Sequence, residues 1–406
     1  MPVGLSGLPT LHPVPGIRLG TAAAGIRKKD RRDLVVIECA PGTQVAATFT
    51  RNRFCAAPVT VAREHLAGSA PRALLINTGF ANAGTGAPGL EDARACCAAL
   101  ARQLNCRAGE ILPFSTGVIG ERLPRERIVD GLPTCLASLN ANGWAEAAHG
   151  IMTTDTLPKG SSRRIRIGAH TITVTGIAKG AGMIRPDMAT MLAFVATDAA
   201  VTPAVLEACL SAAVNQTFNR ITVDGDTSTN DACVLLATEA AGNPVIGRTE
   251  GKDYAALLGV VTEVFTELAQ AIVRDAEGAT KFITIEVSGG RSESDCLAVA
   301  YTIAHSPLVK TAFFASDPNW GRILAAIGRA PIEHLDVARV AIHLNELCVV
   351  RHGAPDAGYS EARGLAVMRL PEVQIGVDLG AGAASARVWT SDLSQDYVRI
   401  NAEYRS

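Results

Sequence analysis

The segment KGAGMIRPDMATMLAF, residues 179–194, places Thr190 directly before an apolar run that is typical of a strand. An internal threonine is a poor nucleophile, but an N-terminal threonine carries its own base, an α-amino group with a pKa of about 7.7 to 8. Thr190 would become N-terminal if its hydroxyl attacked the Ala189 carbonyl and the resulting ester were hydrolysed. The segment therefore has the residues for a self-generated nucleophile.

The backbone before Thr190 fits such an attack. Gly180 and Gly182 have wide conformational freedom, and Pro186 has a fixed φ, so the segment can adopt the strained turn that the attack requires. A threonine that opens a strand is ordinarily structural, however. The segment alone leaves both interpretations open.

A second segment, LPFSTGVIG at residues 112–120, has the chemistry that a threonine nucleophile would need. It predicts a strand end followed by a turn at Thr116 and Gly117. There a hydroxyl and a backbone N–H can point together at a developing oxyanion. An ordinary turn remains the alternative.

Two further motifs suggest other ligands but lack the context. In GTGAPG, Gly84, Gly86 and Gly89 fit a dinucleotide fingerprint with Glu110 about 20 residues on. The preceding strand is expected to end at Asn77, however, too far from the first glycine for the required tight turn.

The other motif, DGDTSTND at residues 224–231, resembles the opening of a calcium loop. Thr229 replaces the glycine at position six, and Leu235 replaces the glutamate at position twelve. We expect a loop held by Asx and Ser/Thr turns instead. No Walker loop, G-x-S-x-G, H-E-x-x-H or zinc-type Cys/His spacing occurs in the sequence.

The composition indicates a globular α/β protein with layered elements. Of 406 residues, 48% are hydrophobic and 19% charged, and 38 Lys and Arg balance 39 Asp and Glu, which favours neither a nucleic-acid nor a membrane partner. No run approaches the ~18 apolar residues of a membrane-spanning helix, and the Pro- and Gly-rich start does not resemble a signal peptide. We expect a cytoplasmic protein.

Periodicity predicts the elements that must position these residues. Helices are expected at 91–104, at 125–139 with an interruption at Pro133, at 253–275, and from Thr202 with Pro203 in its first turn. The expected strands are 73–77, 164–168, 171–177, 191–196, 283–287 and 373–379, the second and third of them forming a hairpin. Strands do not alternate strictly with helices, which favours antiparallel pairs covered by helices.

The segment at 179–194 resembles the self-cleavage segment of ornithine acetyltransferase, the glutamate N-acetyltransferase of the arginine biosynthesis bifunctional protein family. Nearly the whole chain is similar to this family, with the motifs in the expected order. They are STGVIG (115–120), IMTTDT (151–156), DGDTSTND (224–231), DAEGATKF (275–282), SDPNWGR (316–322) and YVRINAEYRS (397–406).

The resemblance implies autocatalytic cleavage between Ala189 and Thr190, with Thr190 as the nucleophile. It further implies an oxyanion hole at two residues and substrate binding at six. The oxyanion residues are Thr116 and Gly117, and the substrate-binding residues are Thr153, Lys179, Thr190, Glu277, Asn401 and Ser406. Lys179 suits a substrate carboxylate, and Glu277 suits a substrate ammonium group or a proton relay.

The resemblance also implies a fold and an assembly. Two mainly antiparallel sheets would be sandwiched between helical layers, α/β/β/α, as in self-processing N-terminal nucleophile proteins. An α chain of 1–189 and a β chain of 190–406 would form one catalytic unit, with a smaller α/β subdomain at about 281–350, in an α2β2 heterotetramer. Phe80 stands where the family has an Asn, in a loop at 77–86 that is expected to hold none of the site residues.

The implied activity is ping-pong acetyl transfer from N2-acetyl-L-ornithine to L-glutamate. It needs no metal and no organic cofactor, and whether acetyl-CoA also serves as donor, which would add an amino-acid N-acetyltransferase activity, stays open. Two alternatives remain: a self-processed aminopeptidase of the same superfamily, and a dinucleotide-binding protein that uses Gly84 to Gly89.

Overall fold

The structure is a computed structural model that describes residues 2–185 and 191–403. The chain divides into two compact units. The larger unit contains Ser6–Asn219 and Thr227–Ile272, and the smaller unit contains Met1–Leu5, Arg220–Asp226 and Val273–Ser406. Each unit is described by itself below.

The larger unit has two sheets, each with one parallel strand pair among antiparallel pairs. The four-stranded sheet, in spatial order, consists of β1 (Ile17–Ala22), β2 (Leu34–Cys39), β4 (Ala73–Phe80) and β5 (Ile111–Val118). The five-stranded sheet, in spatial order, consists of β3 (Gln44–Phe49), β10 (Ala232–Ala237), β8 (Leu192–Thr197), β7 (His170–Lys179) and β6 (Lys159–Ile167).

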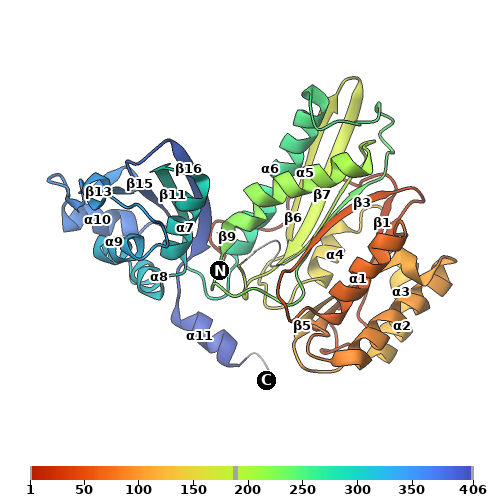
Figure 1. The fold of residues 1–406 in the computed structure, drawn as a ribbon. Helices are drawn as coiled ribbons and strands as arrows, with labels where there is room; N and C mark the ends of the chain where they lie inside the picture. The colour runs from red at the N-terminus through yellow and green to blue at the C-terminus, as the bar shows by residue number, and fades with distance from the viewer. Residues whose placement is uncertain (1, 186–190, 404–406) are drawn as a thin grey trace. The chain divides into compact units, whose positions relative to one another are not determined.

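Helices cover the outer faces of these sheets. The helices of this unit are α1 (Ala57–Gly68), α2 (Gly86–Leu104), α3 (Arg125–Ala137), α4 (Trp144–Gly150), α5 (Pro203–Gln216) and most of α6 (Lys252–Arg274), with short 3-10 turns at Ala108–Glu110 and Phe218–Arg220. α1, α2 and α3 contact the four-stranded sheet, and α5 contacts the five-stranded one (Figure 1). α4 differs, because it contacts strands of both sheets and its side chains join the core between them. The expected α/β/β/α layering is confirmed for this unit.

The two sheets pack face to face because both of their inner faces are apolar. On β2, Val35 and Ile37 point into the core between the sheets, while Leu34 and Val36 point toward the helices. A strand that is buried on both faces does not alternate between apolar and polar residues. The continuous apolar run at the start of β2, LVVIEC, is of this kind. The rings of Phe114 and Phe194 meet edge to face at 5.1 Å across the two sheets.

The smaller unit is a seven-stranded mixed sheet with helices. In spatial order its strands are β14 (Ala354–Pro355), β13 (Leu347–Arg351), β12 (Ala341–Leu344), β15 (Glu372–Asp378), β11 (Phe282–Gly290), β16 (Ala384–Ser391) and β9 (Ile221–Thr222). Its helices are α7 (Glu293–Ala304), α8 (Pro307–Phe314), α9 (Trp320–Gly328), α10 (Glu361–Met368) and α11 (Gln395–Ala402), with a 3-10 turn at Val337–Arg339. The smaller subdomain expected at about 281–350 falls inside this unit, which continues to the end of the chain.

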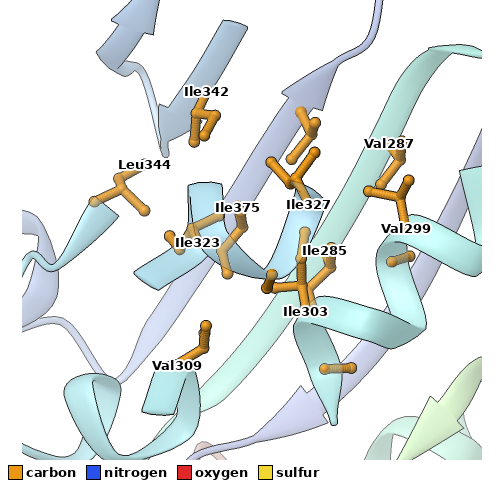
Figure 2. Packing of buried hydrophobic residues seen from close by; sticks show 14 of the residues in the cluster. Ile285, Val287, Val299, Ile303, Val309, Ile323, Ile327, Ile342, Leu344 and Ile375 are labelled. Atoms are coloured by element: carbon orange, nitrogen blue, oxygen red, sulfur yellow. The ribbon is translucent and has the colours of Figure 1, made fainter. Parts of the chain in front are cut away.

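The core of the smaller unit lies between its sheet and helices α7 to α9. Ile375 on the central strand β15 and Ile285 on its neighbour β11 face Ile303 of α7 and Ile323 of α9 (Figure 2). These side chains are fully or almost fully buried. The unit therefore has a hydrophobic core of its own.

The expected elements are present, although several bounds differ: α2 begins at Gly86 and β6 at Lys159, each five residues earlier than expected. α3 runs through Pro133 without interruption, because a proline removes only one backbone bond and the helix buries Ile128, Leu132 and Cys135 against the sheet. β4 continues to Phe80 instead of ending at Asn77, since its pairing with β5 continues that far.

α6 passes the length and hydropathy test for a membrane-spanning helix, which differs from the sequence expectation. Its most apolar 18-residue window has a mean hydropathy of 1.6, and half of that window is buried inside the structure. Phe265 packs on Phe218 at 5.2 Å, while Glu263 and Glu267 form ion pairs with Arg163 of β6. One apolar and one charged face are typical of a core helix in a globular protein.

Candidate functional site

Thr116 and Gly117 lie near the end of β5, where the strand leaves the core. Thr116 is 7% exposed. Gly117 has a φ of +136°, and a Cβ at this position would lie 2.2 Å from the carbonyl carbon of Gly79 on β4. The close approach and the positive φ both require glycine here.

Lys179, the last residue of β7, reaches Thr116 from the facing sheet. Its Nζ donates a hydrogen bond to Thr116 Oγ1 at 3.1 Å. Because the ammonium group has no lone pair to accept with, the hydroxyl proton of Thr116 must point elsewhere. Thr116 can therefore accept from Lys179 and donate to a third group at the same time.

Phe80, the last residue of β4, lies beside this pair, although the segment 77–86 holds none of the expected site residues. A register shift at Gly79 and Phe80 pairs Phe80 with both Thr116 and Val118. The Phe80 ring lies 5.4 Å from the guanidinium carbon of Arg27. Phe80 thus packs beside the strand that presents Thr116.

Thr153 lies in the loop between α4 and β6, and a buried carboxylate holds its backbone. Asp155 Oδ2 accepts from Thr153 N at 2.9 Å, while Oδ1 accepts from Lys159 Nζ at 2.6 Å and from Gly180 N at 2.7 Å. Asp155 and Lys159 were not among the expected site residues. Asp155 falls within the IMTTDT motif, but the only signal that links it to Lys159 is a carboxylate four residues before a lysine, and a surface pair has the same spacing.

Electrostatics keep Asp155 ionised. Burial opposes its ionisation, but the charges of Lys159 and Lys179 and the hydrogen bonds from Lys159 and Thr153 outweigh burial. They hold the pKa of Asp155 well below its usual range.

A second buried carboxylate, Asp231, behaves in the opposite way. It immediately precedes β10, next to the point where Ala232 N donates to the Met191 carbonyl at 2.9 Å. Its Oδ2 is buried and has no hydrogen-bond partner within the described residues. Burial raises the pKa of Asp231 well above its ordinary value, against smaller opposing effects of Ser228 and Lys179.

Glu277 and Asn401 come together in the smaller unit. Asn401 Nδ2 donates to Glu277 Oε2 at 2.7 Å, and Glu277 is 7% exposed. The neighbouring Gly278 has a φ of +67°, and a Cβ there would lie 2.6 Å from Tyr397 N of α11. Glycine therefore lets α11 approach the Glu277 loop closely.

The expected site residues thus fall into three groups. Thr116, Gly117, Lys179 and Thr153 lie in the larger unit, and Glu277 and Asn401 lie in the smaller one. Ala189, Thr190 and Ser406 lie outside the described residues.

The two motifs set aside in the sequence have local structural roles. Asn82 Nδ2 donates to the Gly89 carbonyl at 2.9 Å and Thr85 Oγ1 donates to Asn82 Oδ1 at 2.8 Å, so the glycines of GTGAPG serve a tight helix start. Asx and Ser turns at Asp224 and Ser228 confirm the loop expected at 224–231.

A model of the ArgJ family matches residues 18–406. The "Arginine biosynthesis bifunctional protein ArgJ" of Pseudomonas fluorescens is 57% identical over 406 residues, which is 100% of both chains. The protein with that name from Methylococcus capsulatus is 59% identical over 396 residues, 98% of this chain and 97% of the relative.

Solved structures are similar to parts of the chain. The arginine biosynthesis bifunctional protein argJ of Bacillus halodurans is 40% identical, covers 50% of this chain and 95% of its own, and has a TM-score of 0.48. The ornithine acetyltransferase of Mycobacterium tuberculosis, complexed with ornithine, is 35% identical, with coverage of 44% and 97% and a TM-score of 0.40. The family model and the full-length relatives together show that this chain belongs to the ArgJ family.

Proposed function

We propose that the protein is a glutamate N-acetyltransferase of arginine biosynthesis, which moves the acetyl group of N2-acetyl-L-ornithine to L-glutamate. The observation that carries the proposal is the 57% identity, over the full length of both chains, to a protein named for arginine biosynthesis. The family assignment favours neither the aminopeptidase nor the dinucleotide-binding alternative.

The active enzyme forms by breaking the bond between Ala189 and Thr190. Thr190 Oγ attacks the Ala189 carbonyl carbon, the C–N bond breaks, and the nitrogen gains a proton to become a free α-amine. Water then cleaves the ester and leaves an α chain of 1–189 and a β chain of 190–406. The new amine serves as the base for the hydroxyl of the same residue.

Acetyl transfer then proceeds in two steps. Thr190 Oγ attacks the acetyl carbonyl of acetylornithine, its proton passes through the α-amine to the departing amine nitrogen, and ornithine leaves an acetyl ester on Thr190. The amine of glutamate attacks this ester, the ester C–O bond breaks, and Oγ regains its proton. No step uses a metal ion or an organic cofactor.

Thr116 and Gly117 stabilise the oxyanion of each tetrahedral intermediate. The hydrogen bond from Lys179 to Thr116 Oγ1 supports this role, because it leaves the hydroxyl proton available to the oxyanion. Removal of one such donor typically slows an enzyme by about 10²- to 10³-fold. The closely packed Gly117 fixes the backbone that presents the second donor.

The charges of the proposed substrate-binding residues suit an amino-acid substrate. Lys179 binds a substrate carboxylate, while Glu277, held by Asn401, binds an ammonium group or relays a proton. Thr153, Ser406 and Thr190 complete the substrate contacts.

The assembly and the second activity extend this proposal. Two α and two β chains form a heterotetramer in the cytoplasm. Relatives with the name "bifunctional" support acetyl-CoA as a second donor, which would make the protein an amino-acid N-acetyltransferase as well. Glutamate acetylation with acetyl-CoA as the sole donor tests this activity.

The central test combines mass with activity. Purified protein should give two chains that end and begin at Ala189 and Thr190, and acetylornithine alone should add one acetyl group to the β chain. Thr190→Ala should leave one uncut chain without transfer. An uncut Thr190→Ala protein with full transfer activity would refute the proposal.

A further inference from the structure

Asp155 joins two segments that the proposed function places at the substrate. The first segment is its own loop, where Oδ2 accepts from the backbone N–H of Thr153. The second is the end of β7, where Oδ1 accepts from the N–H of Gly180, the residue after Lys179. One carboxylate therefore binds the backbone at or directly beside two of the proposed substrate-binding residues.

The ion pair with Lys159 stabilises the ionised form of Asp155, which accepts these hydrogen bonds. The side chains of Asp155 and Lys159 are both 0% exposed, and their 2.6 Å contact neutralises the charge of each. Lys159 thus supplies a directly bonded positive charge to this carboxylate. Lys179, whose charge also favours the ionised form of Asp155, donates to Thr116.

The same contact fixes the start of the segment that leads to the cleavage bond. Gly180 has a φ of +154°, and a Cβ there would lie 2.9 Å from Ile184. A backbone with such a φ persists only where the surrounding structure holds it. The 2.7 Å hydrogen bond from Gly180 N to Asp155 is one of the contacts that hold it.

We propose that Asp155 is a positioning residue, which fixes Thr153 and Lys179 relative to each other and sets the direction in which the chain leaves Gly180 toward the Ala189–Thr190 bond. Because its side chain is 0% exposed, Asp155 would act through these two residues and not by contact with the substrate. The inference rests on the proposed function and assigns a role within it.

The test is Asp155→Asn in the full-length chain. An amide has one oxygen, so it can accept the hydrogen bonds of only one of the two carboxylate oxygens. Its NH2 group would face the donors of the other oxygen, and two donors cannot form a hydrogen bond. Self-cleavage, followed on denaturing gels after pulse-labelled cell-free synthesis, should slow by about tenfold or more. In the cleaved fraction, KM for acetylornithine should rise by about tenfold, with a smaller change in kcat.

Two further variants separate positioning from folding. Asp155→Asn combined with Lys159→Met removes the buried charge imbalance, so thermal stability should recover relative to Asp155→Asn alone while slow cleavage and raised KM persist. Asp198→Asn is the matched control, because Asp198 is 4% exposed and accepts from Thr173 N at 2.7 Å at the opposite end of β7. It should leave the cleavage rate and KM within about twofold of wild type.

The outcomes distinguish this inference from the proposed function. Wild-type cleavage and KM in Asp155→Asn, or their recovery in the double variant, would overturn the positioning role and leave the acetyltransferase intact. Failure of the proposed function would appear in the wild-type protein, as neither cleavage nor transfer, and would overturn both.

Discussion

Thr116→Val isolates the proposed oxyanion donor with little change in shape. Valine keeps the β-branched form at a site that is 7% exposed and removes the hydroxyl that accepts from Lys179. Since Gly117 N–H is the proposed second donor, loss of the Thr116 hydroxyl should lower kcat by about 10²- to 10³-fold, or about 3 to 4 kcal/mol. KM should change by less than about tenfold, because Lys179 is only half-buried and can turn to water.

The assay is steady-state acetyl transfer between acetylornithine and glutamate, normalised to the cleaved fraction. Thr175→Val is the matched control, since Thr175 is fully buried on β7 and donates to the His12 carbonyl at 2.7 Å. It should lower stability by about 1 to 3 kcal/mol and leave kcat unchanged. A Thr116→Val enzyme with kcat within about threefold of wild type would refute the oxyanion argument.

Three further predictions concern charge, backbone and burial. Lys179→Met should raise KM for both amino-acid substrates by about tenfold or more in initial-rate assays, because it removes the cation expected at the carboxylate; unchanged KM would contradict this. Gly117→Ala should lower the thermal midpoint and transfer together, because its Cβ would lie 2.2 Å from Gly79; a stable, active variant would contradict the close packing. Asp231→Asn should stabilise the protein increasingly as pH rises above about 4. The pKa of Asp231 is raised in the folded state. At a pH above the pKa of the unfolded chain, the unfolded chain therefore binds fewer protons than the folded protein, and the stability of the wild type falls as pH rises. Thermal melts from acidic to mildly alkaline pH check this sign, and a pH-independent difference would contradict it.

Local patterns were sufficient for elements with strong signals of their own. The alternation in RIRIGAHTITVTGI predicted the β6–β7 hairpin, and Thr202 followed by Pro203 predicted the start of α5. Pro133 led to a wrong prediction of a helix interruption. The free-energy cost of one proline is smaller than the stabilisation gained when one face of α3 is buried. The end of β4 depends on pairing with β5, which no local pattern contains.

The site residues required more than local patterns. The resemblance supplied Thr116 and Lys179 as separate residues. Their hydrogen bond joins strands of two different sheets, and the two residues are 63 positions apart in the sequence. Asp155 and Lys159 look like an exposed i,i+4 pair until folding buries both side chains. Charged residues at buried positions are therefore the part of such a site that a single sequence conceals.

The mass of the denatured, mature protein before and after acetylornithine is added tests self-cleavage and the acetyl-Thr190 intermediate together. We expect two chains divided between Ala189 and Thr190, with one acetyl group then gained by the chain that begins at Thr190. A single full-length mass in a preparation that transfers acetyl groups at full rate would contradict it.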